Sequence, residues 1–175
     1  MTLAHGTDRL ESARLVLRRI AQDDLPFFTR IHALPEVAQH LYPAGRPRCG
    51  LMDLVVESAA PEHGIRRGWF GREQAPAGVA LTFECELSYT FDPAVWGQGF
   101  ATEAVRCVRD YARDVLRLTY AISVILPQNA RSRRVAERFG VRATGQLEVL
   151  GLTWDRYVWP LATGGAPQLQ PASTK

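Results

Sequence analysis

The chain has 175 residues, of which 46% are hydrophobic and 22% charged, a composition typical of a folded globular protein with one core and not of a disordered chain. The net charge of +3 is too small to indicate a nucleic-acid-binding protein, although all of the 21 basic side chains except Lys175 are Arg. Cys49, Cys85 and Cys107 are an odd number without CxxC spacing, which argues against a disulfide framework and against a zinc site.

No segment of the sequence resembles an export signal or a membrane anchor. The N-terminal stretch MTLAHGTDRLESARL lacks an apolar core. No stretch approaches the roughly 18 consecutive apolar residues that indicate a membrane-spanning helix. The sequence therefore predicts a cytoplasmic protein without a membrane partner.

The first quarter of the chain predicts one strand and two helices. Residues 1–11 are polar and are expected to be loose, whereas residues 14–18 have the apolar content of a strand. Asp23, Asp24 and Pro26 mark a helix start, because carboxylates favour the positive end of the helix dipole and Pro is tolerated in the first turn. The helices expected here cover residues 25–33 and 36–41.

The middle of the chain is expected to hold a loop, a helix and three strands. Residues 42–50 are rich in Pro, Gly and Arg and predict a loop. Residues 51–60 predict a helix, because Leu51, Leu54 and Val55 recur at helical spacing. Short apolar runs at hairpin spacing follow, so this part of the sheet is expected to be antiparallel. The expected strands cover residues 69–73, 79–83 and 86–91.

The second half predicts a long amphipathic helix between two strands. Apolar residues from Ala101 to Val115 follow a 3.6-residue period. Residues 118–126 form a nearly continuous apolar run and predict a strand buried on both faces. Strand, helix and strand in this order imply a parallel pair with a right-handed crossover. A short basic helix, a hairpin and a disordered tail are expected over residues 131–139, 141–161 and 162–175.

A pair of glycines precedes the long helix. The first backbone N–H groups of a helix have no partner within it and can bind an anion. Gly97 and Gly99 would let that backbone approach a phosphate closely. The turn lacks the third glycine of GxGxxG and the GK[ST] of a P-loop, so neither a Rossmann dinucleotide site nor an NTPase is supported. The turn and a second strand–turn–helix unit containing PQNARS together predict a pyrophosphate site.

The same two units carry a family resemblance. DPAVWGQGFATEAV and ISVILPQNARSRRVAERFG resemble the GCN5-related N-acetyltransferase (GNAT) superfamily, and most of all its ribosomal-protein N-terminal acetyltransferase (RimJ/RimL-type) branch. SARLVLRRIAQDDLPFF resembles the opening of that branch, and TWDRYVWPL resembles its last strand. The resemblance covers residues 10–161, with a weaker stretch between Pro43 and Trp69.

The resemblance implies an α/β (α+β) GNAT fold. It implies a mixed, mostly antiparallel sheet of about seven strands, splayed between its fourth and fifth strands and flanked by helices. One domain would cover residues 1–161, and acetyl-CoA would lie in the splayed gap as the co-substrate, without a metal. Strand 86–91 would follow the pantetheine arm, and amides of residues 98–102 would hold the pyrophosphate. The implied acetyl-CoA contacts are Tyr89, Thr90, Phe91, Gly97, Gln98, Gly99, Phe100, Ala101, Thr102, Asn129, Arg131, Ser132 and Arg134.

Two residues around the turn are expected to be structural. Trp96 stands where most of the superfamily has Gln or Arg, but the RimJ/RimL branch commonly has Trp there, and we expect it to pack over the loop. Glu103 lies in the first turn of the long helix, where the dipole favours a carboxylate. Since Glu103 would repel phosphates, it is expected to point away from them.

Acetyl transfer requires a proton acceptor for the amine. Glu86, at the start of the fourth strand, is the candidate catalytic base, and Glu84 on the same strand face is its rival. A solvated charge at the start of a strand is the alternative for Glu86. His40 with Tyr42 is a further guess for the lining of the acceptor side.

The leaving thiolate requires a proton donor. Ser132 is the candidate, because the Tyr that donates this proton in much of the superfamily is replaced here by Ala136. Asn129 would bond the pantetheine amide or help to hold the amine. Helix capping is the alternative for both Asn129 and Ser132. Arg131 and Arg134 could meet the 3′-phosphate of CoA, with a solvated helix face as the alternative.

These observations predict an acetyl-CoA-dependent N-acetyltransferase that transfers the acetyl group directly within a ternary complex. No nucleophile with an adjacent base is visible, so an acetyl-enzyme is not expected. The acceptor would be a primary amine: a protein N-terminus, an amino acid or a small amine. A homodimer is compatible with the sequence. The alternatives are a CoA-binding sensor or scaffold without turnover, and a nucleic-acid-associated protein, against which the lack of aromatics within a basic stripe argues.

Overall fold

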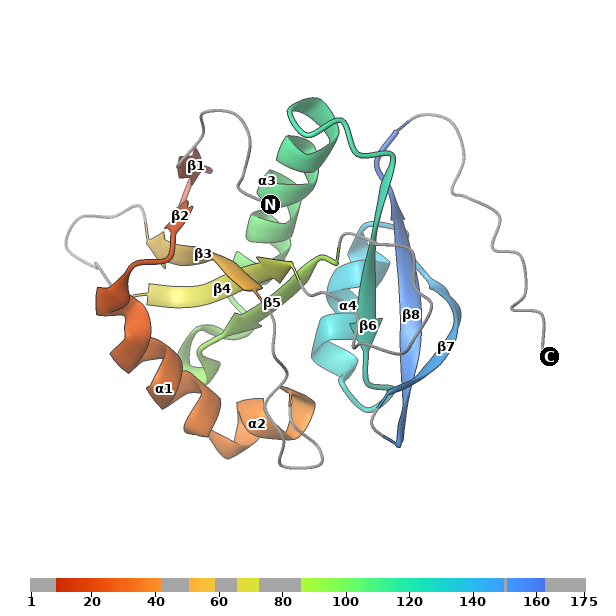
Figure 1. Cartoon of the computed structure of the whole chain (residues 1–175), viewed down its shortest axis with the longest axis horizontal. Coiled ribbons are helices and arrows are strands. Elements are labelled where there is room, and N and C mark those ends of the chain that lie inside the picture. Colours follow the sequence, from red (N-terminus) through yellow and green to blue (C-terminus); the bar gives the residue numbers. More distant parts are fainter. Residues whose placement is uncertain (1–8, 42–50, 59–65, 73–85, 150, 163–175) are drawn as a thin grey trace.

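The computed structural model describes residues 9–41, 51–58, 66–72, 86–149 and 151–162, with 51–58 and 66–72 described as backbone (Figure 1). The strands of this part form two sheets, with orders β1-β2-β3-β4-β5 and β6-β8-β7, in which all neighbours are antiparallel. The strands are β1 (Arg9–Glu11), β2 (Leu15–Arg19), β3 (Leu51–Ser58), β4 (Arg66–Arg72), β5 (Ser88–Phe91), β6 (Tyr120–Ile125), β7 (Ala143–Val149) and β8 (Leu152–Pro160).

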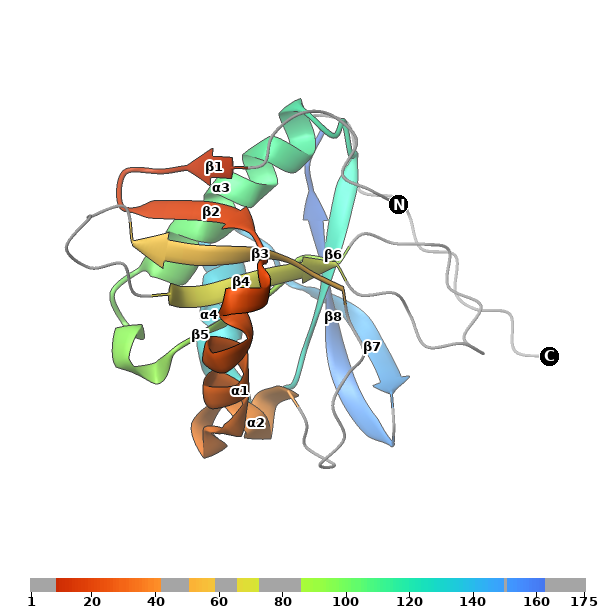
Figure 2. The same ribbon diagram turned by 60° about the vertical axis from the view of Figure 1, so that its left-hand side comes forward.

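Four α-helices flank these sheets within the described residues. Helices α1 and α2 connect β2 to β3, whereas α3 and α4 precede and follow β6. Figure 2 shows α1 in front of the five-stranded sheet and α3 behind it, so helices cover both faces. The helices are α1 (Leu25–Ala33), α2 (Pro35–Leu41), α3 (Phe100–Asp114) and α4 (Ala130–Arg138), and 3₁₀ turns cover Gln22–Asp24 and Pro93–Val95.

A buried ion pair fixes the start of α1. The Asp24 carboxylate is fully buried and accepts hydrogen bonds from the Arg18 guanidinium at 2.9 and 2.8 Å. It also accepts a bond from the Ala21 amide at 2.7 Å. A buried charge is tolerated only when it is paired and hydrogen-bonded in this way. The pair therefore fixes the entry of α1 relative to β2.

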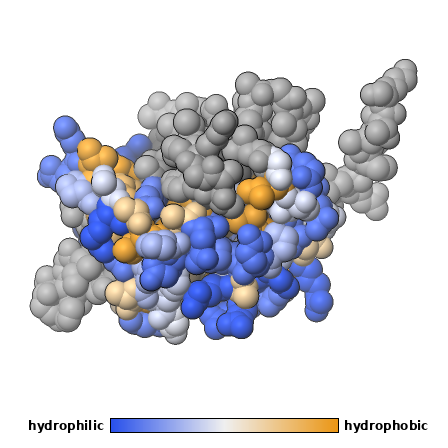
Figure 3. Space-filling model, turned by 90° about the horizontal axis from the view of Figure 1, so that it is seen from below, coloured by the Kyte–Doolittle hydropathy of each residue, from blue (hydrophilic) through white to orange (hydrophobic). Residues whose placement is uncertain are grey.

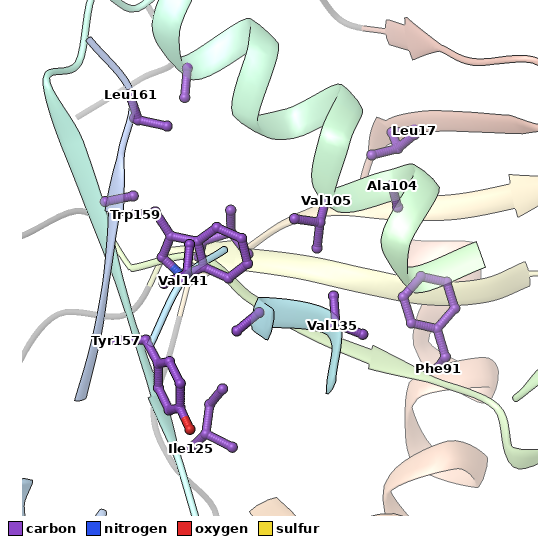
Figure 4. Packing of buried hydrophobic residues seen from close by; sticks show 14 of the residues in the cluster. Leu17, Phe91, Ala104, Val105, Ile125, Val135, Val141, Tyr157, Trp159 and Leu161 are labelled. Atoms are coloured by element: carbon purple, nitrogen blue, oxygen red, sulfur yellow. The ribbon is translucent and has the colours of Figure 1, made fainter. Parts of the chain in front are cut away.

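The main hydrophobic core lies between the sheets and helices α3 and α4 (Figure 4). Leu15 and Leu17 alternate on β2 and are fully buried, as are Ala104 and Val105 on α3. Trp159 of β8 is 1% exposed and is the largest fully buried side chain of the described residues. A second cluster on the other side consists of Phe27, Phe28, Ile31 and Val37 from α1 and α2. Trp96 packs against both clusters and so connects the two cores.

The two sheets meet at one short junction. Within the described residues, a single parallel bridge pairs Glu86 with Ile122, and the Leu87 amide donates to the Ile122 carbonyl at 2.7 Å. The Ser123 hydroxyl donates to the Leu87 carbonyl at 2.5 Å, and Trp159 Nε1 donates to Ser123 Oγ at 2.9 Å. Beyond this junction, β5 and β6 diverge and leave the sheet open between them (Figure 1).

The expected α/β architecture, mostly antiparallel with an opening between neighbouring strands, is confirmed. The helices lie within a residue or two of their expected bounds, and the last hairpin turns at Gly151. Eight strands are seen in the described residues, against about seven expected. The expected parallel pair of strands is reduced to the bridge at Glu86, because β5 and β6 part immediately after it.

Two local predictions are wrong. Residues 51–58, expected to be helical, form β3, which pairs with β2 on one side and β4 on the other. Residues 9–11, expected to be loose, form the edge strand β1 beside β2. The loop expected at 42–50 and the strand expected at 79–83 lie outside the described residues, as does the tail from 163.

None of the helices in the described ranges combines the length and the apolar character needed to cross a bilayer. The longest of them, α3, is amphipathic: Ala104, Val105 and Ala112 are buried, whereas Arg106 and Asp114 are exposed. One face of α3 therefore packs on the sheets while the other meets solvent.

The junction yields a stability prediction. Replacing Ser123 with Ala should lower the free energy of unfolding by about 2 kcal/mol, because the buried Trp159 Nε1 and the Leu87 carbonyl both lose their partner. Urea unfolding followed by fluorescence measures this change. Thr119→Ser, at an exposed position before β6, serves as the control and should leave the midpoint unchanged. A Ser123→Ala protein with the midpoint of the wild type would contradict the importance of this hydrogen-bond chain.

Candidate functional site

A cavity of about 250 Å³ is lined on one side by β5, the strand at the edge of the opening between the sheets. Four parts of the fold contribute to its wall: the end of α2, strand β5, the glycine turn with the start of α3, and the exposed side of α4. Figure 3 views the molecule from below, and hydrophobic patches show there between hydrophilic surfaces. The lining residues are Val37, His40, Leu41, Tyr89, Thr90, Phe91, Val95, Trp96, Gly97, Gly99, Phe100, Ala101, Thr102, Asn129, Arg131, Ser132, Arg134, Val135 and Arg138.

The glycine turn presents the N-terminus of α3 to the cavity. Gly97 and Gly99 have φ values of +78° and +82°, a conformation that side chains other than that of glycine rarely adopt. Gly99 is the N-cap of α3, and no side chain of the described residues caps this helix end. The amides of the first turn therefore keep their capacity to bind an anion.

Trp96 supports the turn from the side of β5. Its Nε1 donates to the Phe91 carbonyl at 2.8 Å, and its ring packs on both hydrophobic clusters. The expected packing role of Trp96 is thus confirmed, but the ring also contributes to the cavity wall. The Arg131 guanidinium of α4 lies over this ring at 4.5 Å from its centroid, which connects two walls of the cavity.

An ion pair between Arg14 and Glu103 stabilises the glycine turn on the side away from the cavity. Glu103 accepts bonds from the Ser12 hydroxyl at 2.7 Å, the Arg14 amide at 2.9 Å and the Arg14 Nε at 2.7 Å. Arg14 Nη1 donates in addition to the Gln98 carbonyl at 3.1 Å, and its guanidinium lies over the Phe100 ring. Glu103 lies outside the cavity lining, so its expected structural role is confirmed.

Two hydroxyl groups meet on the wall between β5 and α4. Ser132 Oγ donates to the Tyr89 hydroxyl at 3.1 Å, and that hydroxyl donates to the Ser132 carbonyl at 3.4 Å. Burial raises the pKa of Tyr89 to about 12, against the smaller opposing effect of the Ser132 hydrogen bond. Tyr89 therefore stays protonated at neutral pH and fixes the direction of the Ser132 hydroxyl.

The other polar groups of the wall have mixed roles. Asn129 caps α4 by accepting a bond from the Ser132 amide at 3.2 Å. Thr90 is 7% exposed, and its hydroxyl has no hydrogen-bond partner in the described part of the chain. A buried hydroxyl without a partner is costly, and one that lines a cavity is suited to bind a ligand. Arg138 Nη1 donates to the Thr102 hydroxyl at 3.1 Å and connects α4 to the first turn of α3.

His40 enters the wall from α2. Its Nδ1 is buried without a hydrogen-bond partner among the described residues. Burial lowers the pKa of His40, and the positive charge of Arg131 lowers it further. The imidazole is therefore mostly neutral at pH 7 and keeps a basic nitrogen.

The structure brings most of the residues predicted from the sequence into one cavity. Glu86 and Gln98 are the exceptions: Glu86 lies in the bridge to Ile122, and Gln98 turns its side-chain amide toward the Ala94 carbonyl at 3.3 Å. The lining residues that sequence reasoning did not assign to the site are Val37, Leu41, Val95, Val135 and Arg138, together with the ring of Trp96. Of these, Arg138 lies in the short basic helix predicted at residues 131–139, and Trp96 was predicted to pack over the glycine turn.

The arrangement combines an open sheet with a cavity whose wall holds an uncapped helix N-terminus and a pair of hydroxyl groups. Residues 14–142 of the chain match the family described as Acetyltransferase (GNAT) domain. This match covers well over half of the sequence, so the chain belongs to the GNAT acetyltransferase family.

Known relatives agree with this membership. The chain is 41% identical over 59 residues to the probable N-acetyltransferase YjcK of Bacillus subtilis, a match spanning 34% of this chain and 33% of that protein. Its fold is similar to the acetyltransferase of Agrobacterium tumefaciens (TM-score 0.65, 23% identity, 91% of this chain and 98% of that one). It is also similar to Mycobacterium smegmatis RimJ in complex with CoA-disulfide (TM-score 0.60, 19% identity, 83% and 81%).

No group of three or more His, Cys, Asp or Glu side chains suited to a metal ion occurs in the part of the chain that the structure describes. The polar groups of the lining are hydroxyl groups, an imidazole, three guanidinium groups, the Asn129 side chain and backbone amides, and they lie among apolar side chains. These groups bind and orient organic anions and carbonyl compounds.

The ion pair behind the turn yields a pH prediction. Burial alone would raise the pKa of Glu103, but the bonds from Ser12 and Arg14 and the charge of Arg14 outweigh it, so the pKa is lowered. A lowered pKa contributes stability above the unfolded value of 4.5 that is lost as the pH falls through the folded pKa. Glu103→Gln should therefore unfold about 1 kcal/mol more easily at pH 7 and should approach the wild type below pH 4. Urea midpoints measured from pH 7 to pH 3 test this, and a difference that is constant with pH would contradict it.

Proposed function

We propose that this protein is an acetyl-CoA-dependent N-acetyltransferase that transfers the acetyl group directly to a primary amine. The observation that carries the proposal is that one cavity contains both the uncapped N-terminus of α3 and the Tyr89–Ser132 hydroxyl pair. The first group suits a pyrophosphate and the second suits a leaving thiolate. Membership of the GNAT family supports acetyl transfer in general.

The wall of the cavity fits the parts of acetyl-CoA in order. Amides of residues 99–102 would bind the pyrophosphate, and Arg134 and Arg138 on α4 would add positive charge for the phosphates. Strand β5 and the unpartnered Thr90 hydroxyl would follow the pantetheine arm, which is rich in amides. Asn129 would offer its side-chain amide near the start of α4. Gln98 would contribute its backbone rather than its side chain.

The acyl-transfer chemistry follows from Ser132. A thiolate leaves more readily when a proton reaches sulfur, and Ser132 would supply that proton. Tyr89 would act as a positioning residue. Its hydroxyl oxygen accepts a hydrogen bond from Ser132 Oγ at 3.1 Å before the reaction, and this bond holds the Ser132 hydroxyl in one rotamer. The Tyr89 hydroxyl is itself bound to Ser132, accepting from its Oγ and donating to its carbonyl, so its role is to orient Ser132.

Within the family, we place the protein in the RimJ/RimL-type branch with a protein N-terminus as the favoured acceptor. Trp96 before the glycines supports this choice, as does Ser132 on α4, with Ala136 at the position where much of the superfamily has tyrosine. A structural relative named RimJ was solved with a CoA-disulfide, which supports CoA as the carrier. Amino acids and small amines remain the competing acceptors. We propose the cytoplasm as the place of action and one domain spanning residues 1–161.

The proposed function is tested with the full-length protein. Titration calorimetry should detect acetyl-CoA binding, and free thiol should appear when an amine is added. The amine panel consists of a peptide that begins with alanine, free alanine, spermidine and paromomycin. The N-acetylated peptide and N-acetylalanine serve as negative controls, because their amines are blocked. Binding without thiol release against any amine would favour the alternative, a CoA-binding sensor or scaffold. The absence of any heat with acetyl-CoA would overturn the proposal.

The pair formed by Ser132 and Tyr89 yields a prediction that distinguishes the proton donor from the residue that orients it. Ser132→Ala should lower kcat about 100-fold, the usual effect of losing a proton donor, with little change in acetyl-CoA affinity. Tyr89→Phe should lower kcat only about 10-fold, because it removes one hydrogen bond that orients Ser132. The Ser132→Ala deficit should narrow above about pH 8.5, where a thiolate no longer needs a proton.

Steady-state thiol release from pH 6 to pH 10 measures these effects. Thr153→Ala, on β8 outside the cavity lining, is the control and should match the wild type. A Ser132→Ala deficit that stays constant across this range would show that Ser132 does not act as the proton donor.

A further inference from the structure

We propose that His40 of α2, rather than Glu86, accepts the proton from the acceptor amine. This inference rests on the proposed function and assigns a catalytic residue within it. The cavity composition, the environment of His40 and the place of Glu86 each support it.

The cavity holds few groups that can accept a proton near neutral pH. No Asp or Glu occurs among its described lining residues. Its hydroxyl groups and its tryptophan do not accept protons at this pH, Tyr89 is a protonated phenol, and the three arginines are permanent cations. His40 is the remaining titratable group of this lining, and its neutral imidazole carries a basic nitrogen.

His40 is also placed to use that nitrogen. Nδ1 is buried and has no hydrogen-bond partner among the described residues, which leaves part of the bonding capacity of the ring unused in the ligand-free chain. A buried polar atom without a partner is destabilising, and one that lines a cavity is suited to bind a ligand. An acceptor amine bound beside α2 would give the ring a hydrogen-bond donor.

The charges around His40 keep it in the neutral form that can accept a proton. Arg131 of α4 acts on His40 across the cavity, and burial and this charge together lower the pKa of the imidazole. The same positive charge disfavours an ammonium ion in the cavity and so lowers the pKa of the bound amine as well. The other titratable groups are Arg134 and Arg138 of α4 and the neutral Tyr89 of β5 on the facing walls, and Glu36 one turn earlier on α2.

Glu86 is less suited to this role. Its backbone forms the bridge to Ile122 at the junction of the sheets, and it does not contribute to the cavity wall. The proton acceptor must come within hydrogen-bonding distance of the amine, directly or through one water. His40 shares the cavity with Ser132, and Glu86 does not.

The proton balance of the step is simple. The ammonium group of the acceptor gives one proton to His40, and the neutral nitrogen then forms a bond to the carbonyl carbon of the thioester. The carbon–sulfur bond breaks with its electron pair on sulfur, and the second nitrogen proton reaches sulfur by way of the Ser132 hydroxyl. His40 releases its proton to solvent, so the products are an amide, a free thiol and one proton.

The test compares variants of two histidines in the full-length protein. His40→Asn retains a polar atom near the position of Nδ1 but cannot take a proton at this pH. It should lower kcat about 100-fold with acetyl-CoA affinity unchanged. The wild-type rate should rise with pH through an ionisation below 6.5, and His40→Asn should lack this ionisation. His40→Ala should regain part of its activity when imidazole is added to the buffer.

His32→Asn is the matched control. His32 lies on α1, burial lowers its pKa too, its ring contacts Phe28, and it is absent from the cavity lining. It should show the wild-type rate and the wild-type pH profile. His40→Gln is measured in parallel as a second variant that lacks the imidazole. Circular dichroism identifies a variant that fails to fold, and the other variant then decides the result.

The outcomes separate this inference from the proposed function. Wild-type protein that binds no acetyl-CoA, or releases no thiol with any amine of the panel, would overturn the proposed function and the inference with it. Active wild-type protein whose His40→Asn and His40→Gln variants keep the rate and the low-pH ionisation would overturn the inference alone. Loss of that ionisation in Glu86→Gln, with His40→Asn unaffected, would return the role to Glu86.

Discussion

The site depends on how little of β5 and β6 is paired. In the part of the chain that the structure describes, one bridge at Glu86 and Ile122 joins the two sheets, and the hydrogen-bond chain from Trp159 through Ser123 to the Leu87 carbonyl reinforces it from within the core. None of these junction residues lines the cavity, whose wall on this side is formed by Tyr89, Thr90 and Phe91, further along the chain.

The mouth of the cavity is held by charges that do not enter it. Glu103 would repel phosphates if it faced them, but Arg14 and Ser12 bind it on the far side of α3. The same Arg14 bonds the Gln98 carbonyl, so one guanidinium fixes both the helix and the turn before it. A carboxylate near a helix N-terminus usually stabilises the helix by opposing its dipole. Here its pairing leaves the dipole and the amides available to an anion.

Features that depend on neighbouring residues in the sequence were predicted, whereas contacts between residues far apart in the sequence were missed. The glycine turn, the Asp24 helix start and the Asn129 cap depend on neighbouring residues and were predictable. Residues 51–58 were predicted wrongly as a helix, because a strand in the middle of a sheet loses the alternating pattern that distinguishes it from a helix. The pairing of Tyr89 with Ser132 joins residues 43 positions apart. Only the packing of β5 against α4 shows that Tyr89, on the strand, meets the hydroxyl of the helix.

The distribution of charge suggests why the proposed site would use an imidazole. Binding a carrier with several phosphates requires positive charge, and Arg131, Arg134 and Arg138 supply it along one wall of the same cavity. A carboxylate base close to these arginines would be held in an ion pair, which lowers its pKa and its basicity. A cation lowers the pKa of a histidine as well, but from the higher ordinary value of 6.5. A cationic wall thus reduces the basicity of both groups, and the imidazole, which starts from the higher pKa, remains the better proton acceptor near neutral pH.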